Sequence, residues 1–305
     1  MASEKQLLII DSNSVIHRAY HALPPLTAKS GELVNAVYGF LLVFLKAVKE
    51  FKPVYVAACF DVKGPTFRHK KFQEYKATRP KAPEDLYPQI SAVKEILRAF
   101  NVPVFEKEGF EADDIIGTIA ALSPVKTIIL SGDADALQLV DSKTKVFALR
   151  KGVKDTVLYN EQLTKEKFNG LVAGQISDFK ALRGDPSDNI PGVKGIGDKT
   201  ATELILEFGD IDNLYEEIGE NSVKVKKLKT RIKELLLEYK EQAFLSRDLA
   251  KIEKKAPIDF NLEKCRWADY DKEEVRALFE NFGFYSLIKR LPENRPSLGG
   301  NLKLW

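Results

Sequence analysis

The first half of the chain alternates short apolar runs with stretches whose apolar residues recur at helical spacing. Apolar runs of strand length lie at residues 7–10, 54–60, 103–105, 127–130 and 146–149. Helical spacing occupies residues 35–51, 88–100 and 112–122. Because strands alternate with amphipathic helices, the pattern predicts an α/β fold with a mostly parallel sheet and helices on both faces.

The second half keeps the helical spacing but has almost no strands. Apolar residues recur every three or four positions at 176–182, 199–208, 211–218, 223–250 and 272–282. We therefore predict an α/β domain at 1–172 and an all-α domain at 173–291. Residues 292–305 are rich in Pro, Gly and Asn and are expected to form a linker or tail.

Composition favours a cytoplasmic globular protein. Hydrophobic residues make up 44% of the 305 positions and charged residues 30%, as in ordinary globular domains. No apolar run is long enough to span a bilayer, and the first residues lack the apolar core of a signal peptide. Cys59 and Cys265 are too few for a disulfide framework, so we expect two reduced thiols. We expect no membrane partner.

Charge is concentrated in patches, although the formal net charge is only +3. Residues 63–81 contain seven Lys or Arg and one Glu, and residues 223–233 contain six Lys or Arg and no acid. The acids gather at the ends of apolar runs. An acidic pocket in basic surroundings suits a polyanion held next to bound cations. Taken alone, each basic run fits a solvated helix face equally well.

Several acids follow the predicted strands. Asp11, Asp61 and Asp133 come at or just after strand ends, and the carboxyl ends of parallel strands share one edge where ligands bind. These acids can therefore meet although they are far apart in sequence. Others join them at the start of a helix and beside Asp133: Glu111, Asp113, Asp114 and Asp135.

Helix capping explains only one of the acids at the helix start, and is worth roughly 0.3 to 1 kcal/mol. Carboxylates about 4 Å apart repel by on the order of 4 kcal/mol per pair at an effective dielectric near 20. A stable protein would need cations there. Oxygen ligands without His or Cys indicate Mg²⁺ or Mn²⁺, and two or more such ions make a phosphodiester-cleaving site. With three histidines in all, no Ser-His-Asp arrangement competes.

A glycine turn at 189–205 is the most specific local motif. Gly195 and Gly197 leave backbone N–H groups bare beside Lys194, Lys199 and Thr200, at the start of a helix near Asp198. Such a turn can hold a DNA phosphate without reading sequence. The pattern is that of a helix-hairpin-helix; the alternative is an ordinary turn between helices. It lacks the spacing of an ATP-binding loop.

Two more acids lie just upstream of this turn. Asp185 and Asp188 sit at the edge of the predicted DNA-binding turn and could reach back to the cation site, which would tie the two halves together. The alternative for Asp188 is a simple helix cap.

Taken together, the motifs at 8–22, 60–68, 75–80, 109–117, 131–135 and 183–201 follow one another in a familiar order. They resemble the 5′-nuclease (5′–3′ exonuclease) domain of bacterial DNA polymerase I, within the wider flap endonuclease family. The resemblance covers roughly residues 6–291. It implies a PIN-like α/β domain with a helical arch at about 63–90, followed by a helix-three-turn-helix domain that binds duplex DNA.

The resemblance also assigns roles. It implies nine metal-site acids: Asp11, Asp61, Glu111, Asp113, Asp114, Asp133, Asp135, Asp185 and Asp188. It implies Asp61 and Asp113 nearest the hydrolytic ion, and Asp133, Asp135 and Asp188 nearest the second. The catalytic set is expected to be Asp11, Asp61, Asp113, Lys76 and Arg79. DNA contacts are expected from Arg18, Arg68, Tyr75, Lys76 and Arg79.

Tyr75 is expected to stack on a base at the cut site; the alternative is an aromatic packed on the sheet. The resemblance implies 5′–3′ exonuclease and flap-cutting activity on nicked, flapped or 5′-ended DNA, in primer removal, replication and repair. We expect a nucleoid-associated monomer, with a DNA polymerase linked to it or separate. Two other functions stay open: a DNA-binding module without catalysis, and a PIN-type ribonuclease.

Overall fold

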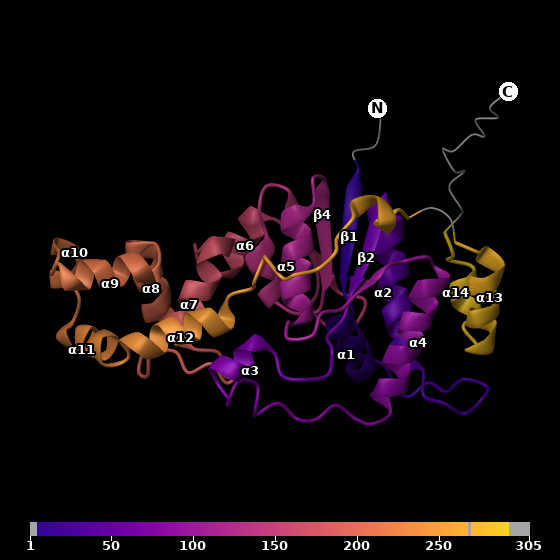
Figure 1. The fold of residues 1–305 in the computed structure, drawn as a ribbon, viewed down its shortest axis with the longest axis horizontal. Helices are drawn as coiled ribbons and strands as arrows, with labels where there is room; N and C mark the ends of the chain where they lie inside the picture. Colours follow the sequence, from indigo (N-terminus) through magenta and orange to yellow (C-terminus); the bar gives the residue numbers. More distant parts are fainter. Residues whose placement is uncertain (1–4, 268–269, 293–305) are drawn as a thin grey trace.

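The computed structural model describes residues 5–267 and 270–292, and a six-stranded sheet lies at its centre (Figure 1). The strands stand in the order β3-β2-β1-β4-β5-β6. All neighbouring pairs are parallel except β5 with β6. The bounds are β1 (Gln6–Asp11), β2 (Tyr55–Cys59), β3 (Val104–Phe105), β4 (Lys126–Ser131), β5 (Thr144–Leu149) and β6 (Thr156–Tyr159). The predicted mostly parallel sheet is confirmed.

Helices cover both faces of this sheet, because successive strand residues point to opposite sides. Leu8 and Ile10 of β1 face one core, and Leu7 and Ile9 face the other. All four side chains are fully buried. The covering helices are α1 (Ser12–Ala22), α2 (Asn35–Phe51) and α4 (Leu86–Ala99) on the first face and α5 (Ala112–Leu122) on the second.

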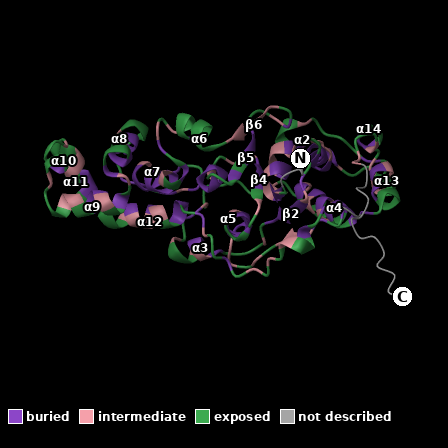
Figure 2. Cartoon of the chain, turned by 90° about the horizontal axis from the view of Figure 1, so that it is seen from above, coloured by how far each residue is buried: buried purple, intermediate pink, exposed green. Residues whose placement is uncertain are grey.

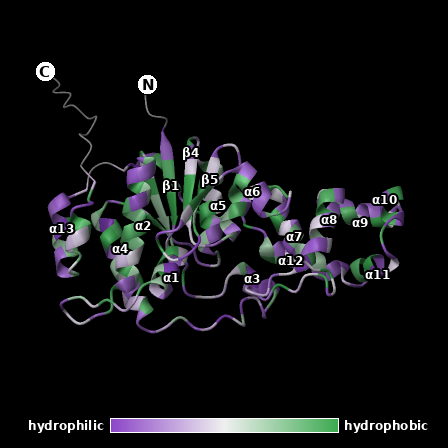
Figure 3. Cartoon of the chain, turned by 180° about the vertical axis from the view of Figure 1, so that it is seen from behind, coloured by the Kyte–Doolittle hydropathy of each residue, from purple (hydrophilic) through white to green (hydrophobic). Residues whose placement is uncertain are grey.

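The helical half extends to one side of the sheet and has its own core (Figure 1). Apolar residues such as Leu182, Leu204 and Leu236 are buried there. Figure 3 shows hydrophilic and hydrophobic bands on these helices, as amphipathic helices require. They are α7 (Ile176–Arg183), α8 (Asp198–Phe208), α9 (Ile211–Gly219), α10 (Val223–Lys226), α11 (Thr230–Glu238) and α12 (Lys240–Ala250).

The chain returns to the sheet after α12. Ile252 and Cys265 join the core beneath α5, and Trp267 joins the opposite core. The last helices, α13 (Lys272–Asn281) and α14 (Tyr285–Ile288), bury Phe279 and Phe284 against the same core as α2 and α4. The separate helical unit therefore ends near Ala250. Figure 2 shows that α13 and α14, at the opposite end of the molecule from α10, also contain buried residues.

Several elements escaped the hydrophobic pattern. Helix α1 follows directly on β1, and its short buried stripe of Val15, Ile16 and Ala19 was overlooked, whereas α6 (Glu161–Lys167) is mostly polar. Strand β6 is an edge strand whose four residues are only partly buried. The single helical stretch expected at 223–250 is divided into three helices. The remaining connections include the 3₁₀ turns η1 (Asp135–Leu139), η2 (Ala173–Gln175) and η3 (Leu262–Cys265).

The segment expected to form a helical arch is mostly not helical. It contains the five-residue helix α3 (Phe67–Lys71), then turns and extended chain until α4 begins at Leu86. Figure 1 shows this chain running along one side of the molecule between α3 and α4. Of the described helices, none is both long and apolar enough to cross a membrane.

Candidate active site

The strand ends meet at a pocket of about 500 Å³. Seven of the nine predicted metal-site acids line it: Asp11, Asp61, Glu111, Asp113, Asp133, Asp135 and Asp188. The same pocket is lined by Arg18, Lys76 and Arg79, and by Asn13, Ser14, His17 and His21, which the strand-end argument did not anticipate. The pocket thus brings together acids from the strand ends, the start of α5 and the turn after α7, up to 177 positions apart from residue 11 to residue 188.

Asp11 ends β1 and caps α1. Its Oδ2 accepts a hydrogen bond of 2.6 Å from the Ser131 hydroxyl, and its Oδ1 accepts one of 3.3 Å from the backbone N–H of Ser14. Burial raises the pKa of Asp11 to about 7. The negative charges of Asp133 and Asp61 also raise this pKa, whereas the hydrogen bond from Ser131 lowers it. Without a cation, this carboxyl therefore titrates near neutral pH.

The start of α5 brings three acids to the same place. Asp61 lies at the rim and accepts a 2.8 Å hydrogen bond from the N–H of Ala112. Glu111 is the N-cap residue, and its Oε1 lies 3.0 Å from Lys76 Nζ. Asp113 accepts no hydrogen bond from any described residue. Burial, followed by the charges of Asp11 and Asp133, raises the pKa of Asp113 well above its ordinary value.

Arg68 and Asp114, predicted as a DNA contact and a metal-site acid, form a buried ion pair with each other and do not line the pocket. The guanidinium donates to both Asp114 oxygens at 2.8 and 2.7 Å, and to the carbonyls of Leu249 and Lys251. Asp114 is fully buried and also accepts from the N–H groups of Glu111 and Glu253. Its oxygens are therefore occupied by protein donors. With 2% of its surface exposed, Arg68 is out of reach of a DNA phosphate.

Tyr75 is likewise internal in this structure, which speaks against the predicted stacking on a base. Only 3% of it is exposed, and it packs in a small apolar cluster with Ile190 and Leu249. Its hydroxyl donates to Glu111 Oε2 at 3.1 Å and to Asp188 Oδ2 at 3.4 Å. Tyr75 therefore orients two pocket acids. Its position fits the alternative of a packed aromatic side chain better than it fits stacking on a base.

The next residues form a basic wall. Lys76 adopts a left-handed backbone (φ 56°), a conformation that costs a non-glycine residue roughly 1–3 kcal/mol and that clusters at functional sites. Its N–H donates to the carbonyl of Asp188 at 2.9 Å, so the strained turn is tied to the helical half. Arg79 forms an ion pair with Asp188, and its side chain stays 48% exposed. Across the pocket, Arg18 donates to the carbonyl of Gly132 at 2.8 Å.

Asp185 lies beyond the pocket lining, but a lysine connects it to the site. Lys180 Nζ stands 2.6 Å from Asp185 Oδ2 and also contacts Asp135 Oδ1. Lys180 was absent from the predicted site. The available signal was a charged residue within the apolar stretch 176–182, which becomes the buried face of α7.

The glycine turn lies between α7 and α8, as predicted. Gly195 has φ +93°, whereas Gly197 has an ordinary backbone angle and acts as the N-cap of α8. Lys194, Gly195, Gly197 and Lys199 are all exposed, and the Lys199 side chain is 90% exposed. The start of α8 and both lysines are therefore on the surface, where a phosphate can reach them.

The pocket chemistry fits a hard divalent cation, because carboxylate oxygens dominate and Asp113 lacks a protein donor. In the described parts of the chain, no three acidic, His or Cys side chains are grouped as ligands of one ion. Lys76, Arg79 and Lys180 pair with carboxylate oxygens of Glu111, Asp188 and Asp135. These cations therefore neutralise part of the acidic charge in this arrangement.

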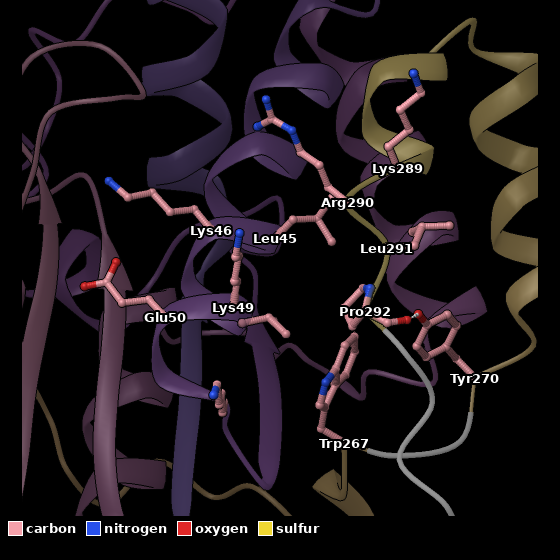
Figure 4. A pocket seen from close by; sticks show the side chains of 12 residues that line it. Leu45, Lys46, Lys49, Glu50, Trp267, Tyr270, Lys289, Arg290, Leu291 and Pro292 are labelled. Carbon is pink, nitrogen blue, oxygen red and sulfur yellow. Dashed lines mark hydrogen bonds between the residues drawn. The ribbon is translucent and has the colours of Figure 1, made fainter.

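A larger cavity of about 1000 Å³ lies elsewhere, between the end of α2 and the segment around Pro292 (Figure 4). Its cations are Lys46, Lys49, Lys52, Lys289 and Arg290, and its one acid is Glu50. Trp267 and Tyr270 form its apolar wall. Because the carboxylates at the strand ends converge in the smaller, acidic pocket, that pocket is the candidate active site.

The structure thus combines a mostly parallel sheet, an acidic pocket at its strand ends and an exposed glycine turn in the helical half. Residues 6–169 match the family described as "5′-3′ exonuclease, N-terminal resolvase-like domain". Residues 171–273 match "5′-3′ exonuclease, C-terminal SAM fold". The chain belongs to the 5′–3′ exonuclease family and is a nuclease of that family, as its sequence motifs suggested.

The curated relatives are longer than this chain. DNA polymerase I of Bacillus subtilis (strain 168) is 41% identical over 297 residues, which cover 96% of this chain and 33% of the relative. DNA polymerase I of Caldicellulosiruptor bescii is 42% identical over 291 residues, covering 94% of this chain and 33% of the relative. The chain thus spans about a third of the length of these relatives.

Solved structures share the fold. One described as divalent zinc ions bound to T5 5′-exonuclease superposes with a TM-score of 0.66 at 22% identity, covering 82% of this chain and 90% of that one. A Rad2 catalytic core in complex with DNA substrate gives 0.62 at 18% identity, covering 94% and 93%. At this identity the likeness establishes the PIN-like sheet and the following helical domain, as predicted from the resemblance.

Proposed function

We propose that the chain is a structure-specific 5′–3′ exonuclease and flap endonuclease that hydrolyses DNA phosphodiesters. The observation that carries this proposal is the meeting of seven carboxylates in one pocket whose wall includes Arg18, Lys76 and Arg79. The acids suit cations and the bases suit phosphates. Family membership and the DNA polymerase I relatives support DNA as the substrate.

The residues of the pocket have three roles in this proposal: phosphate binding, charge stabilisation and positioning of the acids. Arg79 is half exposed and lies beside Asp188, so it can bind a phosphate entering from solvent. Lys76 stands at Glu111 and can stabilise charge on the scissile phosphate. Tyr75 and Ser131 hold Glu111 and Asp11 in place through their hydroxyl groups. The DNA strand then lies across the pocket mouth between Arg18 and Arg79.

Two or more Mg²⁺ or Mn²⁺ ions complete this proposal. The pocket acids Asp11, Asp61, Glu111, Asp113, Asp133, Asp135 and Asp188 would hold them, with Asp185 reached through rearrangement of its Lys180 pair. Bound there, such ions activate water and stabilise the leaving oxygen. The T5 exonuclease structure with divalent zinc and the raised pKa of Asp113 support a cation site.

The glycine turn is proposed to hold the duplex part of the same substrate. The exposed N-terminus of α8, with Lys194, Gly195, Gly197, Lys199 and Thr200 around it, presents N–H groups and positive charge to one strand. We place the protein as a monomer at the nucleoid, in primer removal, replication and repair. A DNA polymerase, linked as in the relatives or separate, would supply its substrates.

Cleavage assays test the proposal directly. The protein is incubated with a 5′-flap DNA, a nicked duplex and a structured RNA, each with Mg²⁺ and with EDTA. We expect flap cutting that requires Mg²⁺ and is lost in Asp113→Ala, with DNA affinity only modestly reduced. DNA binding without cutting would support a module without catalysis. Preferential cutting of RNA would support a ribonuclease.

Salt dependence tests the glycine turn separately. Lys199→Ala should weaken binding to all duplex sequences about equally and lower the salt slope by about 1, because Lys199 meets a phosphate rather than a base. Binding is measured by fluorescence anisotropy between low and moderate salt, with the exposed Lys165→Ala on α6 as control. A loss confined to certain sequences would contradict the proposed role.

A further inference from the structure

Lys180 is a buried amine clamped between acids from the two halves of the molecule. It lies on α7, where only 7% of it is exposed among buried neighbours such as Phe179 and Leu182. Its Nζ contacts Oδ1 of Asp135, from the sheet edge, and stands 2.6 Å from Oδ2 of Asp185, in the turn after α7. One ammonium therefore joins the helical half to the catalytic edge.

The amine stays charged despite its burial. Burial by itself would lower the pKa of Lys180, but the charges of Asp135 and Asp185 outweigh it and raise the pKa above its ordinary value. Asp185 is further fixed by the N–H and hydroxyl of Ser187 at 2.9 and 2.6 Å. With Lys180 gone, Asp135 and Asp185 would face each other without a described cation between them.

Asp135 lines the acidic pocket, so the position of Lys180 bears on cation binding there. We propose that Lys180 is a built-in counter-ion: it holds Asp135 and Asp185 together when no divalent ion is bound, and by its charge it weakens the affinity of the pocket for divalent ions. This inference rests on the proposed cation site and gives Lys180 a positioning role, acting through Asp135.

The physical reasoning has two parts. A fixed positive charge beside Asp135 repels a divalent ion bound to the same carboxylate, and even in a water-like dielectric the repulsion at about 6 Å amounts to roughly a tenfold change in affinity. Removing the ammonium also leaves two partly buried carboxylates unpaired, which destabilises the metal-free protein. A divalent ion would then replace the lost charge and restore stability.

The test compares wild type, Lys180→Met and Lys180→Arg, with the exposed Lys165→Met as a matched control. Mn²⁺ affinity is measured by titration calorimetry on the full chain without DNA, and thermal midpoints are measured in EDTA and in Mn²⁺. Asp113→Asn, which should weaken Mn²⁺ binding, checks that the heat signal reports the acidic pocket.

We expect Lys180→Met to lower the midpoint in EDTA by roughly 5–10 °C and to bind Mn²⁺ about tenfold more tightly, with a larger Mn²⁺-induced rise in midpoint than wild type. Lys180→Arg and Lys165→Met should match wild type in Mn²⁺ affinity. If Lys180→Met folds poorly, Lys180→Gln, which keeps a hydrogen-bond donor toward Asp135 and Asp185 without the charge, should recover part of the midpoint in EDTA and keep the tighter Mn²⁺ binding.

The outcomes separate the two proposals. Equal or weaker Mn²⁺ binding by the variants that lack a positive charge at position 180 would overturn the counter-ion role and leave the cation site standing. If wild type itself bound no Mn²⁺, the proposed cation site would be wrong, and the role of Lys180 would fall with it.

Discussion

At the scale of single residues, the pocket contains carboxylates that destabilise the protein when no cation is bound. Ionisation of Asp113 costs free energy, because burial and the charges of Asp11 and Asp133 hold its pKa well above the ordinary value of 3.8. No described protein group donates a hydrogen bond to offset that cost. A residue with such surroundings is stabilising only when a cation is present, which is why its removal gives a clear test.

Asp113→Asn should raise the thermal midpoint in EDTA while abolishing cleavage in Mg²⁺. The native state holds the Asp113 proton more tightly than the unfolded chain, so ionisation costs stability as the pH rises above about 4. The advantage of the variant should therefore be small at pH 4, grow toward pH 8, and disappear when Mg²⁺ binds the wild type. Melting curves followed by circular dichroism check this; an advantage that shrinks with rising pH would contradict it.

A second residue-scale prediction concerns the buried ion pair. Arg68→Met leaves the fully buried Asp114 without its cation, which should cost about 3–5 kcal/mol of unfolding free energy. Lys71→Met is the matched control on the same short helix: its pair with Asp248 is 48% exposed on both sides and should contribute less than about 1 kcal/mol. Urea unfolding measures both. Similar losses in the two variants would refute an internal structural role for Arg68.

The sequence indicated which acids meet, but not which of them lack a hydrogen-bond donor from the protein. Asp114 and Asp113 are adjacent in the chain and alike in type, yet one is saturated by Arg68 and two backbone N–H groups while the other has no protein donor. That distinction depends on residues 68 and 253, which the strand-end argument could not place. Lys180 was missed for the same reason, since a helical pattern does not show that a charged residue faces two acids.

At the scale of elements, strong apolar periodicity predicted well and polar elements did not. The bounds of α2 and α5 were predicted correctly at 35–51 and 112–122, because their buried residues repeat at helical spacing. The arch segment was expected to be helical by resemblance alone. Here it is largely turns and extended chain, with Pro80 and Pro83 in the stretch before α4, and proline opposes helix in the residue that precedes it.

The turn between α7 and α8 should be intolerant of a side chain at one glycine and tolerant at another. At Gly192, φ is +63° and an added Cβ would lie 2.2 Å from the backbone N of Gly184. Its N–H and carbonyl are also held by Ser246 and Gln242 of α12. Gly192→Ala should therefore cost about 2–4 kcal/mol and loosen the DNA-binding turn.

Gly197→Ala is the control for that prediction. Its φ of −100° suits any residue, and nothing lies within 4 Å of an added Cβ. Its unfolding free energy should stay within about 0.5 kcal/mol of wild type, so any loss of duplex affinity would come from blocking the approach of a phosphate. Equal destabilisation by the two substitutions would contradict the backbone argument.

At the scale of the whole molecule, a sheet domain is followed by a helical domain, and the chain after Ala250 returns to pack on the sheet. Helical spacing at 272–282 was correctly predicted, but periodicity reveals a buried face and not the surface that buries it. Trp267, Phe279 and Phe284 belong to the core formed by α2 and α4, and the Trp267 ring lies 5.6 Å from the ring of Phe44.

This arrangement makes truncation informative. A chain ending at Ala250 would lose three large buried aromatics from the first-half core, each worth about 2 kcal/mol, a loss that rivals the whole stability of a typical domain. We expect it to unfold or aggregate, whereas a chain ending at Pro292 should melt like the full chain, since it keeps every described core residue. Calorimetry of the chains ending at Ala250 and at Pro292 measures their thermal midpoints. Cooperative unfolding of the chain cut at Ala250, at the midpoint of the full chain, would show that α13 and α14 are dispensable for the stability of the sheet core.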